Sequence, residues 1–241
     1  MTNKTMYTTT REELYTSPLP EETKSYKPIE NRRLIETTLE SIDKAGFNLK
    51  SEIYTAARES QQSNGRYVIG NVGDSEMSLQ IGWQNSYNKT LSLKFCLGSY
   101  IFICENGAVH GDMGHFKKKH SGEIQNFTPQ AISDYISQAS DSFVKMQKDR
   151  DEMKKIEMNK DVQSTILGYM FFQKELMSIT QLGIIKREMD RPTYNYNADD
   201  SLWQLYNNVT VSYKNSHPSL WMKQHMDLHN FINNEILENN L

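Results

Sequence analysis

Residues 66–109, RYVIGNVGDSEMSLQIGWQNSYNKTLSLKFCLGSYIFICENGAV, contain the pattern that decides the fold of this chain. Apolar and polar residues alternate over residues 77–84, and the alternation recurs over residues 91–97. A period of two is typical of a strand that buries one of its faces. Residues 100–104 form a continuous apolar run, which predicts a strand that is buried on both faces.

Turn residues separate these predicted strands. Asn64-Gly65 predicts a hairpin turn, Gly73-Asp74-Ser75 predicts another, and Gly98-Ser99 predicts a tight connection. A weaker strand is expected at residues 53–57, before the first of these turns. The whole segment therefore predicts an antiparallel β-meander of about four or five strands.

Helical patterns flank the sheet on both sides. Residues 30–45 carry apolar side chains at helical spacing, and Gly46 is a suitable C-cap. Thr128-Pro129 predicts the start of a long helix that reaches about residue 158. Further helices are expected at residues 161–178, 201–213 and 218–237. This order predicts an α+β fold, in which an antiparallel meander packs with segregated helices and the C-terminal part is helix-rich.

The chain has 241 residues, which is enough to bury a sizeable core, and we expect one domain with three parts. Residues 1–28, which are rich in Thr, Glu and Pro, are expected to form an extended N-terminal arm. Residues 29–127 hold the first helix and the antiparallel sheet core, and residues 128–241 form the helical part of the same domain. The candidate anchors of the arm are Tyr7, Leu14, Tyr15 and Tyr26. A mobile tail is the favoured alternative.

Composition excludes some classes of protein. Aromatic residues make up 10% of the chain, which argues against global disorder. The formal net charge of -3 gives no overall basic character, so a nucleic-acid-binding face has to be a local patch. The N-terminus shows no apolar leader and no apolar run approaches the length of a membrane span, so we expect no membrane partner.

Cysteine content indicates the redox environment. Cys96 and Cys104 are too few for a disulfide scaffold in a chain of this length. Both fall in predicted strands, where a free cysteine behaves as a small apolar residue. These features favour a reducing, cytoplasmic location.

Three histidines in a predicted loop are candidate metal ligands. His110, His115 and His120 recur every five residues, close to Cys104. Clustered in space they would suit zinc, and a metal-dependent hydrolase is a weak alternative for the chain. Their spacing matches no zinc signature, however, and solvated loop histidines are the favoured interpretation. We therefore predict no metal ligand and no cofactor.

No catalytic motif stands out elsewhere. His225 and His229 lie four residues apart on a predicted helix, but the general-base Glu of the protease motif does not stand between them. A surface or interface pair is the favoured interpretation of these two histidines. The short turn at residues 70–73 is not followed by a helix, so it lacks the geometry of a phosphate-binding loop. We predict no catalytic residue, and an enzyme is the less favoured class.

Basic and aromatic side chains are interspersed along the predicted sheet and the loop that follows it. Basic contacts to the backbone, combined with aromatic stacking of bases, hold single-stranded nucleic acid without reading its sequence. The residues expected to make such contacts are Arg66, Lys89, Lys94, Lys117, Lys118 and Lys119, with aromatic support from Tyr87. On composition alone, cross-strand aromatic packing beside a solvated lysine turn is the favoured interpretation.

Short motifs in the patterned segment resemble a known family. Asn85-Ser86 follows the alternating strand, and the last strands end in Cys104-Glu105-Asn106-Gly107. Residues 205–210, LYNNVT, match a later helix. Together they resemble the domain of unknown function 932, which is common on phages, plasmids and other mobile elements, over about residues 26–215. That family usually has a histidine where this chain has Tyr87.

The motif residues also have a purely structural interpretation. Asn85 and Asn106 are expected near strand ends, where Asn tolerates the left-handed conformation and its amide bonds to local backbone. Gly107 permits a positive φ after the strand. With Ser86 and Cys104, these residues are predicted to be structural rather than ligand-binding.

The resemblance implies a genetic context and no particular reaction. The family has no established activity, and its genes occur beside genes for DNA processing. The order of helix, meander and long helix also resembles the Rad52-like single-strand annealing proteins, which form rings and hold single-stranded DNA in a basic groove. The implied function is a non-enzymatic phage or mobile-element protein that binds single-stranded DNA and promotes annealing or recombination as a homo-oligomer.

A protein–protein interaction module without a nucleic-acid role is the alternative function. Host takeover, anti-defence and virion association are the roles it would include. The net charge of -3 and the abundance of Tyr and Asn favour it, since aromatic residues are common anchors of interfaces.

Overall fold

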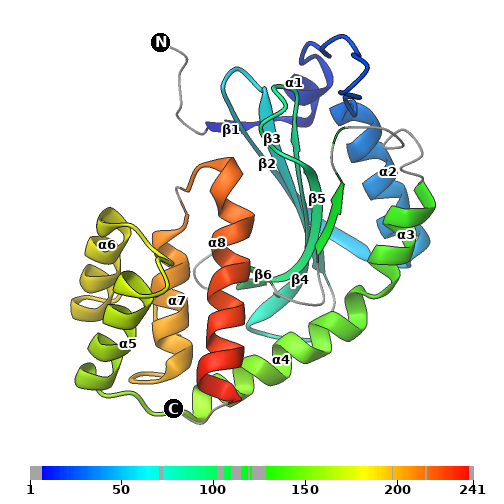
Figure 1. The fold of residues 1–241 in the computed structure, drawn as a ribbon. Helices are drawn as coiled ribbons and strands as arrows, with labels where there is room; N and C mark the ends of the chain where they lie inside the picture. Colours follow the sequence, from blue (N-terminus) through cyan, green and yellow to red (C-terminus); the bar gives the residue numbers. More distant parts are fainter. Residues whose placement is uncertain are drawn as a thin grey trace.

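The computed structural model describes residues 7–70, 73–101, 106–109, 115–118, 120, 129–196, 198–214 and 216–238. Within these ranges, one antiparallel sheet lies between two groups of helices (Figure 1). The α+β class that the sequence predicts is confirmed. Of the helices described, none is long and apolar enough to cross a membrane.

The sheet has seven strands within the described residues, and every pair of neighbours is antiparallel. The spatial order follows the chain from β1 to β6, and β7 also pairs with β5. The strands are β1 (Tyr7–Thr9), β2 (Asn48–Ala57), β3 (Gln62–Gly70), β4 (Met77–Ser86), β5 (Leu93–Ile101), β6 (Asn106–Val109) and β7 (His115–Lys118).

The predicted hairpin turn at Asn64-Gly65 is wrong, because both residues lie inside β3. The turn between β2 and β3 is instead made by residues 58–60, which have φ angles of 52°, 56° and 62°. Gly65 is a glycine because the indole of Trp83 lies against it. A Cβ at Gly65 would stand 2.4 Å from Cε2 of Trp83. The Asn-Gly pair here therefore reflects a close packing contact rather than a turn.

The predicted connection at Gly98-Ser99 is also wrong. Both residues lie inside β5, where Gly98 is the register partner of Gln80 in β4 and of Val109 in β6. The two strands expected on either side of it are one strand over residues 93–101.

The helices are α1 (Arg11–Tyr15), α2 (Asn31–Lys44), α3 (Pro129–Ser137), α4 (Ala139–Lys155), α5 (Lys160–Phe172), α6 (Ile179–Asp190), α7 (Leu202–Ser212), α8 (Pro218–Phe231) and the π-helical η2 (Ile232–Leu237). The long helix expected from residue 129 is divided into α3 and α4 at Gln138. The helix expected over residues 161–178 ends at Phe172. Helix α6 then begins after Ser178, which forms a capping box with Gln181.

Helices cover both faces of the sheet, so every residue of β4 is buried. The apolar face, which includes Ile81 and Trp83, belongs to the main core together with residues of α2, α3 and α4. The opposite face carries Gln80, Gly82 and Gln84 and lies under α8, where Trp221 approaches Gly82. In Figure 1, α2 and α3 lie on one side of the sheet, and α7 and α8 lie on the other.

The described part of the N-terminal arm, residues 7–28, packs against the body of the protein. Strand β1 pairs with β2, and the side chains of Leu14 and Tyr26 are buried. Arg11 forms an ion pair of 2.6 Å with Glu52 of β2. These residues are therefore anchored, as the first interpretation of the arm requires, and the mobile-tail alternative does not describe them.

Candidate functional site

The Asn85-Ser86 motif at the end of β4 joins three segments of the chain. Asn85 is 0% exposed, and its Nδ2 donates to the carbonyl of Ile29 and to Oδ1 of Asn31, both at 2.9 Å. The Ser86 hydroxyl donates to the carbonyl of Leu91 and accepts from the Leu91 N–H, both at 3.0 Å. The motif therefore connects the start of α2 and the turn at residues 87–92 to the end of β4, and these contacts are structural.

Tyr87 is not available to a base, which corrects its predicted role. Its side chain is 3% exposed, and its hydroxyl accepts a hydrogen bond of 2.8 Å from the backbone N–H of Asn31. Burial raises the pKa of Tyr87 to about 12, against a smaller opposing effect of that hydrogen bond. A ring enclosed in this way holds the turn in place and has no free face for stacking.

A cavity of about 390 Å³ opens beside this turn, and we call it the turn pocket. It is lined by Ser25, Tyr26, Lys89, Thr90, Leu91, Ser92 and His120. The arm, the turn after β4 and His120 therefore meet here, although they are far apart in the sequence.

An aromatic ring and a cation form adjacent walls of the turn pocket. The Tyr26 hydroxyl donates to the carbonyl of Ser86 at 2.9 Å, which fixes the ring. The Tyr26 ring lies 5.5 Å from the His120 ring, centroid to centroid. Nζ of Lys89, an exposed residue with a φ of 64°, lies 5.0 Å from the centroid of the Tyr26 ring. This distance is typical of a cation–π contact.

His120 is the buried polar group of the turn pocket, with 6% of its surface exposed. Nδ1 lies 3.3 Å from the carbonyl oxygen of Lys27, and the Lys27 N–H donates to the His120 carbonyl at 2.9 Å. A carbonyl only accepts, so Nδ1 carries the hydrogen. Burial lowers the pKa of His120, against a smaller opposing effect of the Lys27 carbonyl. Near pH 7 the ring is neutral, and Nε2 presents a lone pair with no partner among the described residues.

Four of the predicted lysines lie at the same end of the sheet as the turn pocket. Lys89 lines it, and Lys94 stands near the start of β5. Lys94 is the register partner of Lys117 in β7, and the neighbouring Leu93 is the partner of Lys118. Lys119 lies outside the described residues.

Arg66 does not belong to this group, which corrects the predicted set of contacts. It lies in β3 on the face covered by α8, and its guanidinium carbon is 5.3 Å from the centroid of the Trp221 ring. Desolvation by burial lowers the pKa of Arg66. Arg66 therefore packs against α8 and is half-buried there.

The remaining predicted residues fall in three places. His115 is in β7, Asn106 and Gly107 begin β6, and Cys96 is buried in β5 as predicted. His110 and Cys104 lie outside the described residues. Among the residues that the structure describes, no group of three or more His, Cys, Asp or Glu side chains could hold a metal ion.

His225 and His229 are buried rather than on the surface, so that prediction is wrong. Nε2 of His229 lies 3.3 Å from Oδ2 of Asp149 and 2.9 Å from Nδ2 of Asn233. His225 packs beside the ring of Trp221, and burial lowers its pKa to about 3. The pair turns inward because α8 crosses the sheet and packs against α4 through its last turns.

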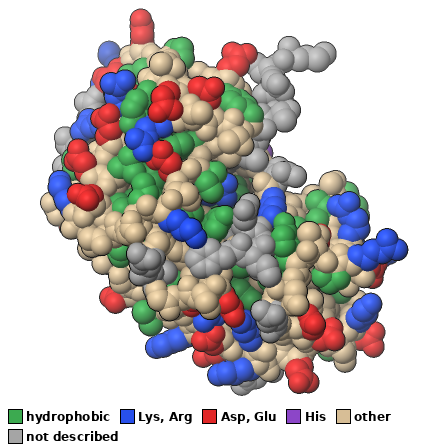
Figure 2. Space-filling model, turned by 180° about the vertical axis from the view of Figure 1, so that it is seen from behind, with side chains coloured by type: hydrophobic (Ala, Val, Ile, Leu, Met, Phe, Trp, Pro, Cys, Tyr) green, Lys and Arg blue, Asp and Glu red, His purple; other side chains and the backbone are tan. Residues whose placement is uncertain are grey.

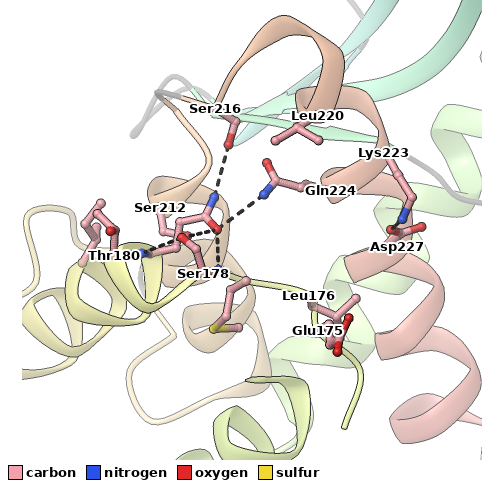
Figure 3. Close-up of a pocket in the computed structure, with 13 residues that line it drawn as sticks. Glu175, Leu176, Ser178, Thr180, Ser212, Ser216, Leu220, Lys223, Gln224 and Asp227 are labelled. Atoms are coloured by element: carbon pink, nitrogen blue, oxygen red, sulfur yellow. Dashed lines mark hydrogen bonds and ion pairs between the residues drawn. The ribbon is translucent and has the colours of Figure 1, made fainter. Parts of the chain in front are cut away.

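A second cavity of about 610 Å³, which we call the helical pocket, lies between α6 and α8 (Figure 3). Gln181 stands at its centre, where it accepts from the Ser178 N–H at 2.8 Å and donates to the Ser216 hydroxyl at 3.2 Å. Leu220 lies on the same wall as Gln224. Sequence reasoning missed this cavity because it predicted a helix over residues 161–178 and none over residues 179–190, although the Ser178-x-x-Gln181 capping box marks the start of α6.

Sequence reasoning also missed the turn pocket as a unit. Tyr26 was considered only as an anchor and His120 only as a metal ligand. Their positions in the sequence carry no signal of contact, because the His120–Lys27 pairing joins residues 93 apart. On the face shown in Figure 2, acidic and basic side chains are mixed, so the described part of that face has no broad basic surface.

One comparison with known proteins gives a match. A family model described as "Domain of unknown function (DUF932)" matches residues 18–233 of the chain. The match covers most of the chain, including the Asn85-Ser86 motif and the residues of both pockets, and the chain belongs to this family. No curated protein and no solved structure matches the chain, so the resemblance to Rad52-like annealing proteins stays a prediction.

Proposed function

We propose that this member of the DUF932 family is a non-enzymatic phage or mobile-element protein that binds single-stranded DNA and promotes annealing as a homo-oligomer. One observation supports the proposal: the turn that carries Lys89 and the paired segments of β5 and β7 that carry Lys94, Lys117 and Lys118 meet at one end of the sheet. The lining of that pocket includes Lys89 and no described Asp or Glu. The net charge of the chain is -3, so contacts to the phosphate backbone of DNA require a local cluster of lysines such as this one.

The proposed contacts are narrower than the set expected from the sequence. Lys89, Lys94, Lys117 and Lys118 remain, because they belong to the turn and the paired strands at this end of the sheet. Lys119 stays in the set as an expectation from the sequence. Arg66 and Tyr87 are left out, because α8 and α2 cover them. Tyr26 lines the pocket but is 3% exposed, as Tyr87 is, so no aromatic stacking is proposed.

Fluorescence anisotropy with a labelled single-stranded oligonucleotide tests the proposal. We expect binding at 50 mM salt that weakens steeply toward 200 mM, because each phosphate contact releases counterions. The double variant Lys89→Gln/Lys117→Gln should bind about tenfold more weakly and show a shallower salt dependence. The matched control is Lys186→Gln on α6, an exposed lysine at the helical end, which should bind as the wild type does. No binding at low salt would overturn the proposal.

The alternative function, a protein–protein module, is favoured by a different observation. Phe172 and Ile179, at the facing ends of α5 and α6, are 76% and 71% exposed, and Leu220 on α8 is 48% exposed. Leu220 lines the helical pocket, and exposed apolar side chains are typical of an interface. A host-lysate pull-down distinguishes the two functions. A partner that survives nuclease treatment and is lost with Phe172→Ser/Ile179→Ser supports the module, whereas a partner lost on nuclease treatment counts against it.

A further inference from the structure

We infer that the helical pocket docks a peptide segment of a partner protein, one that places an apolar side chain in the cavity and a Lys or Arg beside Glu175. The inference goes beyond DNA binding and uses none of the lysines at the other end of the molecule, so it can fail while the proposed function stands. The groups that carry it are open to solvent, because Glu175 and Thr180 are exposed and Leu220 is 48% exposed.

The cavity has an apolar wall at which a side chain can be buried. Its apolar lining residues are Leu176, Met177, Ile184 and Leu220. Leu176 and Met177 pack with the main core, whereas Leu220 on α8 stays half-exposed. The volume of about 610 Å³ lies within the range of ligand sites, about 300–1,000 Å³. An apolar side chain that covers Leu220 removes apolar surface from water, so this wall favours an apolar group.

The charges of the lining leave one carboxylate uncompensated. The charged residues that line the cavity are Glu175, Lys223 and Asp227. Nζ of Lys223 donates to Oδ2 of Asp227 one turn further along α8, so these two charges offset each other (Figure 3). Lys174, next to Glu175 in the chain, is paired with Glu235 at 2.7 Å. Among the described residues Glu175 has no ion-pair or hydrogen-bond partner. A carboxylate in this state favours a cationic side chain on the partner.

The backbone fixes where Glu175 stands relative to the apolar wall. Glu175 has a φ of 51°, and the N–H of the next residue, Leu176, donates to the carbonyl of Met170 at 3.0 Å. The Leu176 carbonyl accepts from the Tyr213 hydroxyl at 2.9 Å. Glu175 and Leu220 lie at opposite ends of the lining drawn in Figure 3. The cation and the apolar group that they favour are therefore separate groups of one ligand, as two side chains of a peptide are.

Apolar surface continues outside the cavity, which favours a peptide over a small molecule. Ile179 stands between two lining residues, Ser178 and Thr180, and is 71% exposed. Ile179 does not line the cavity, so a ligand that covers it has to extend beyond the cavity. The Thr180 hydroxyl has no partner among the described residues and can donate to a peptide carbonyl. A nucleic acid is disfavoured, because the lining carries two carboxylates and one ammonium group.

Selection of a random peptide library displayed on phage against the full chain tests the inference. We expect enriched peptides to combine an apolar side chain with a Lys or Arg. For the strongest binder, labelled and measured by fluorescence anisotropy, Leu220→Ser should weaken binding roughly tenfold. Glu175→Lys should weaken it by a similar factor, and a peptide with Glu in place of its Lys or Arg should restore binding to that variant. The matched control is Glu152→Lys, an exposed residue on α4 that lines neither pocket, which should bind as the wild type does.

Other results would overturn the inference. They are the enrichment of no peptide, the enrichment of acidic peptides, and a selected peptide that is insensitive to both Leu220→Ser and Glu175→Lys. A tripeptide cut from the selected peptide that binds as tightly would indicate a small-molecule site instead. Displacement of the peptide by a single-stranded oligonucleotide would indicate a nucleic acid. If the peptide dissociates a homo-oligomer in sedimentation velocity, the occupant is a second copy of the chain. Both substituted positions are exposed, so the variants should fold, which circular dichroism checks.

Discussion

The two pockets differ in the kind of structure that builds them. The turn pocket is formed by an N-terminal arm, a strand connection and the residue that follows β7, and its lining is polar with one exposed cation. The helical pocket is formed by α6, α8 and the residues before α6, and apolar side chains lie exposed at its edge. An exposed cation at a polar pocket suits the phosphate groups of a nucleic acid, whereas an exposed apolar side chain at a pocket suits a protein. This difference predicts that a substitution can abolish binding at one pocket without affecting the other.

The largest effect is expected from Asn85→Ala, which should damage only the turn pocket. The change leaves the Ile29 carbonyl and Oδ1 of Asn31 without the donor they now share, in a position that is 0% exposed. We expect a loss of about 3 kcal/mol in the free energy of unfolding, measured by urea denaturation. At urea concentrations below the denaturation midpoint, binding of single-stranded DNA should also weaken. The control Asn230→Ala, at a half-exposed position on α8, should change stability by less than about 0.5 kcal/mol. A small effect of Asn85→Ala would contradict the structural role of the motif.

A smaller loss of stability is expected from Asp74→Asn. Asp74 lines neither pocket, so the change should spare both. Oδ2 of Asp74 accepts from Arg150 Nη1 at 2.6 Å and from Gln147 Nε2 at 2.8 Å, which joins the turn before β4 to α4. Burial acts to raise the pKa of this carboxyl, but the hydrogen bonds outweigh burial and lower the pKa to about 2. We expect a loss of about 2 kcal/mol at pH 7, measured by chemical denaturation.

The pH dependence of the Asp74 contribution follows from the direction of its shift. A carboxylate with a lowered pKa stabilises the fold fully above its ordinary value of 3.8, and the stabilisation is lost as the pH falls toward about 2. The difference in the free energy of unfolding between the wild type and Asp74→Asn should therefore decrease as the pH falls through that interval. A difference that is constant from pH 7 to pH 2 would show that the ion pair is not the cause.

At the helical pocket, Ser178→Ala should have a smaller effect on stability. The Ser178 hydroxyl accepts from the Gln181 N–H at 3.3 Å and completes the capping box of α6. Loss of an N-cap costs about 1 kcal/mol, measured as a shift of the denaturation midpoint. Ser178→Thr keeps the hydroxyl and serves as the control. Binding of single-stranded DNA should not change in either variant, and a change would show that the two pockets are coupled.

The smallest effect on folding is expected from Phe172→Ser, because the side chain is 76% exposed. The free energy of unfolding should change by less than about 0.5 kcal/mol. DNA binding should stay at the wild-type level, while retention of a protein partner in a pull-down should fall. If Phe172→Ser weakens DNA binding instead, the nucleic acid reaches the helical end and the division between the two pockets is wrong.

The sequence predicted elements better than it predicted connections. Alternation over residues 77–84 indicated β4 because a strand between two packed layers still alternates in polarity, even though both of its faces are buried. Gly65 and Gly98 misled the analysis because glycine marks close packing as well as turns. The true turn at residues 58–60 has positive φ angles at three non-glycine residues, so it carried no glycine signal.

The sequence by itself determined the fold class and the family, because these depend on local periodicity and on short contiguous motifs. Only the tertiary structure decided which basic and aromatic residues share a site. It buried Tyr87 against Asn31, placed Arg66 under Trp221, and brought Tyr26 and His120 together from opposite ends of the sheet segment. Contacts between residues about 90 positions apart are set by how the arm and the strands pack, and that packing leaves no periodic trace in the residues concerned.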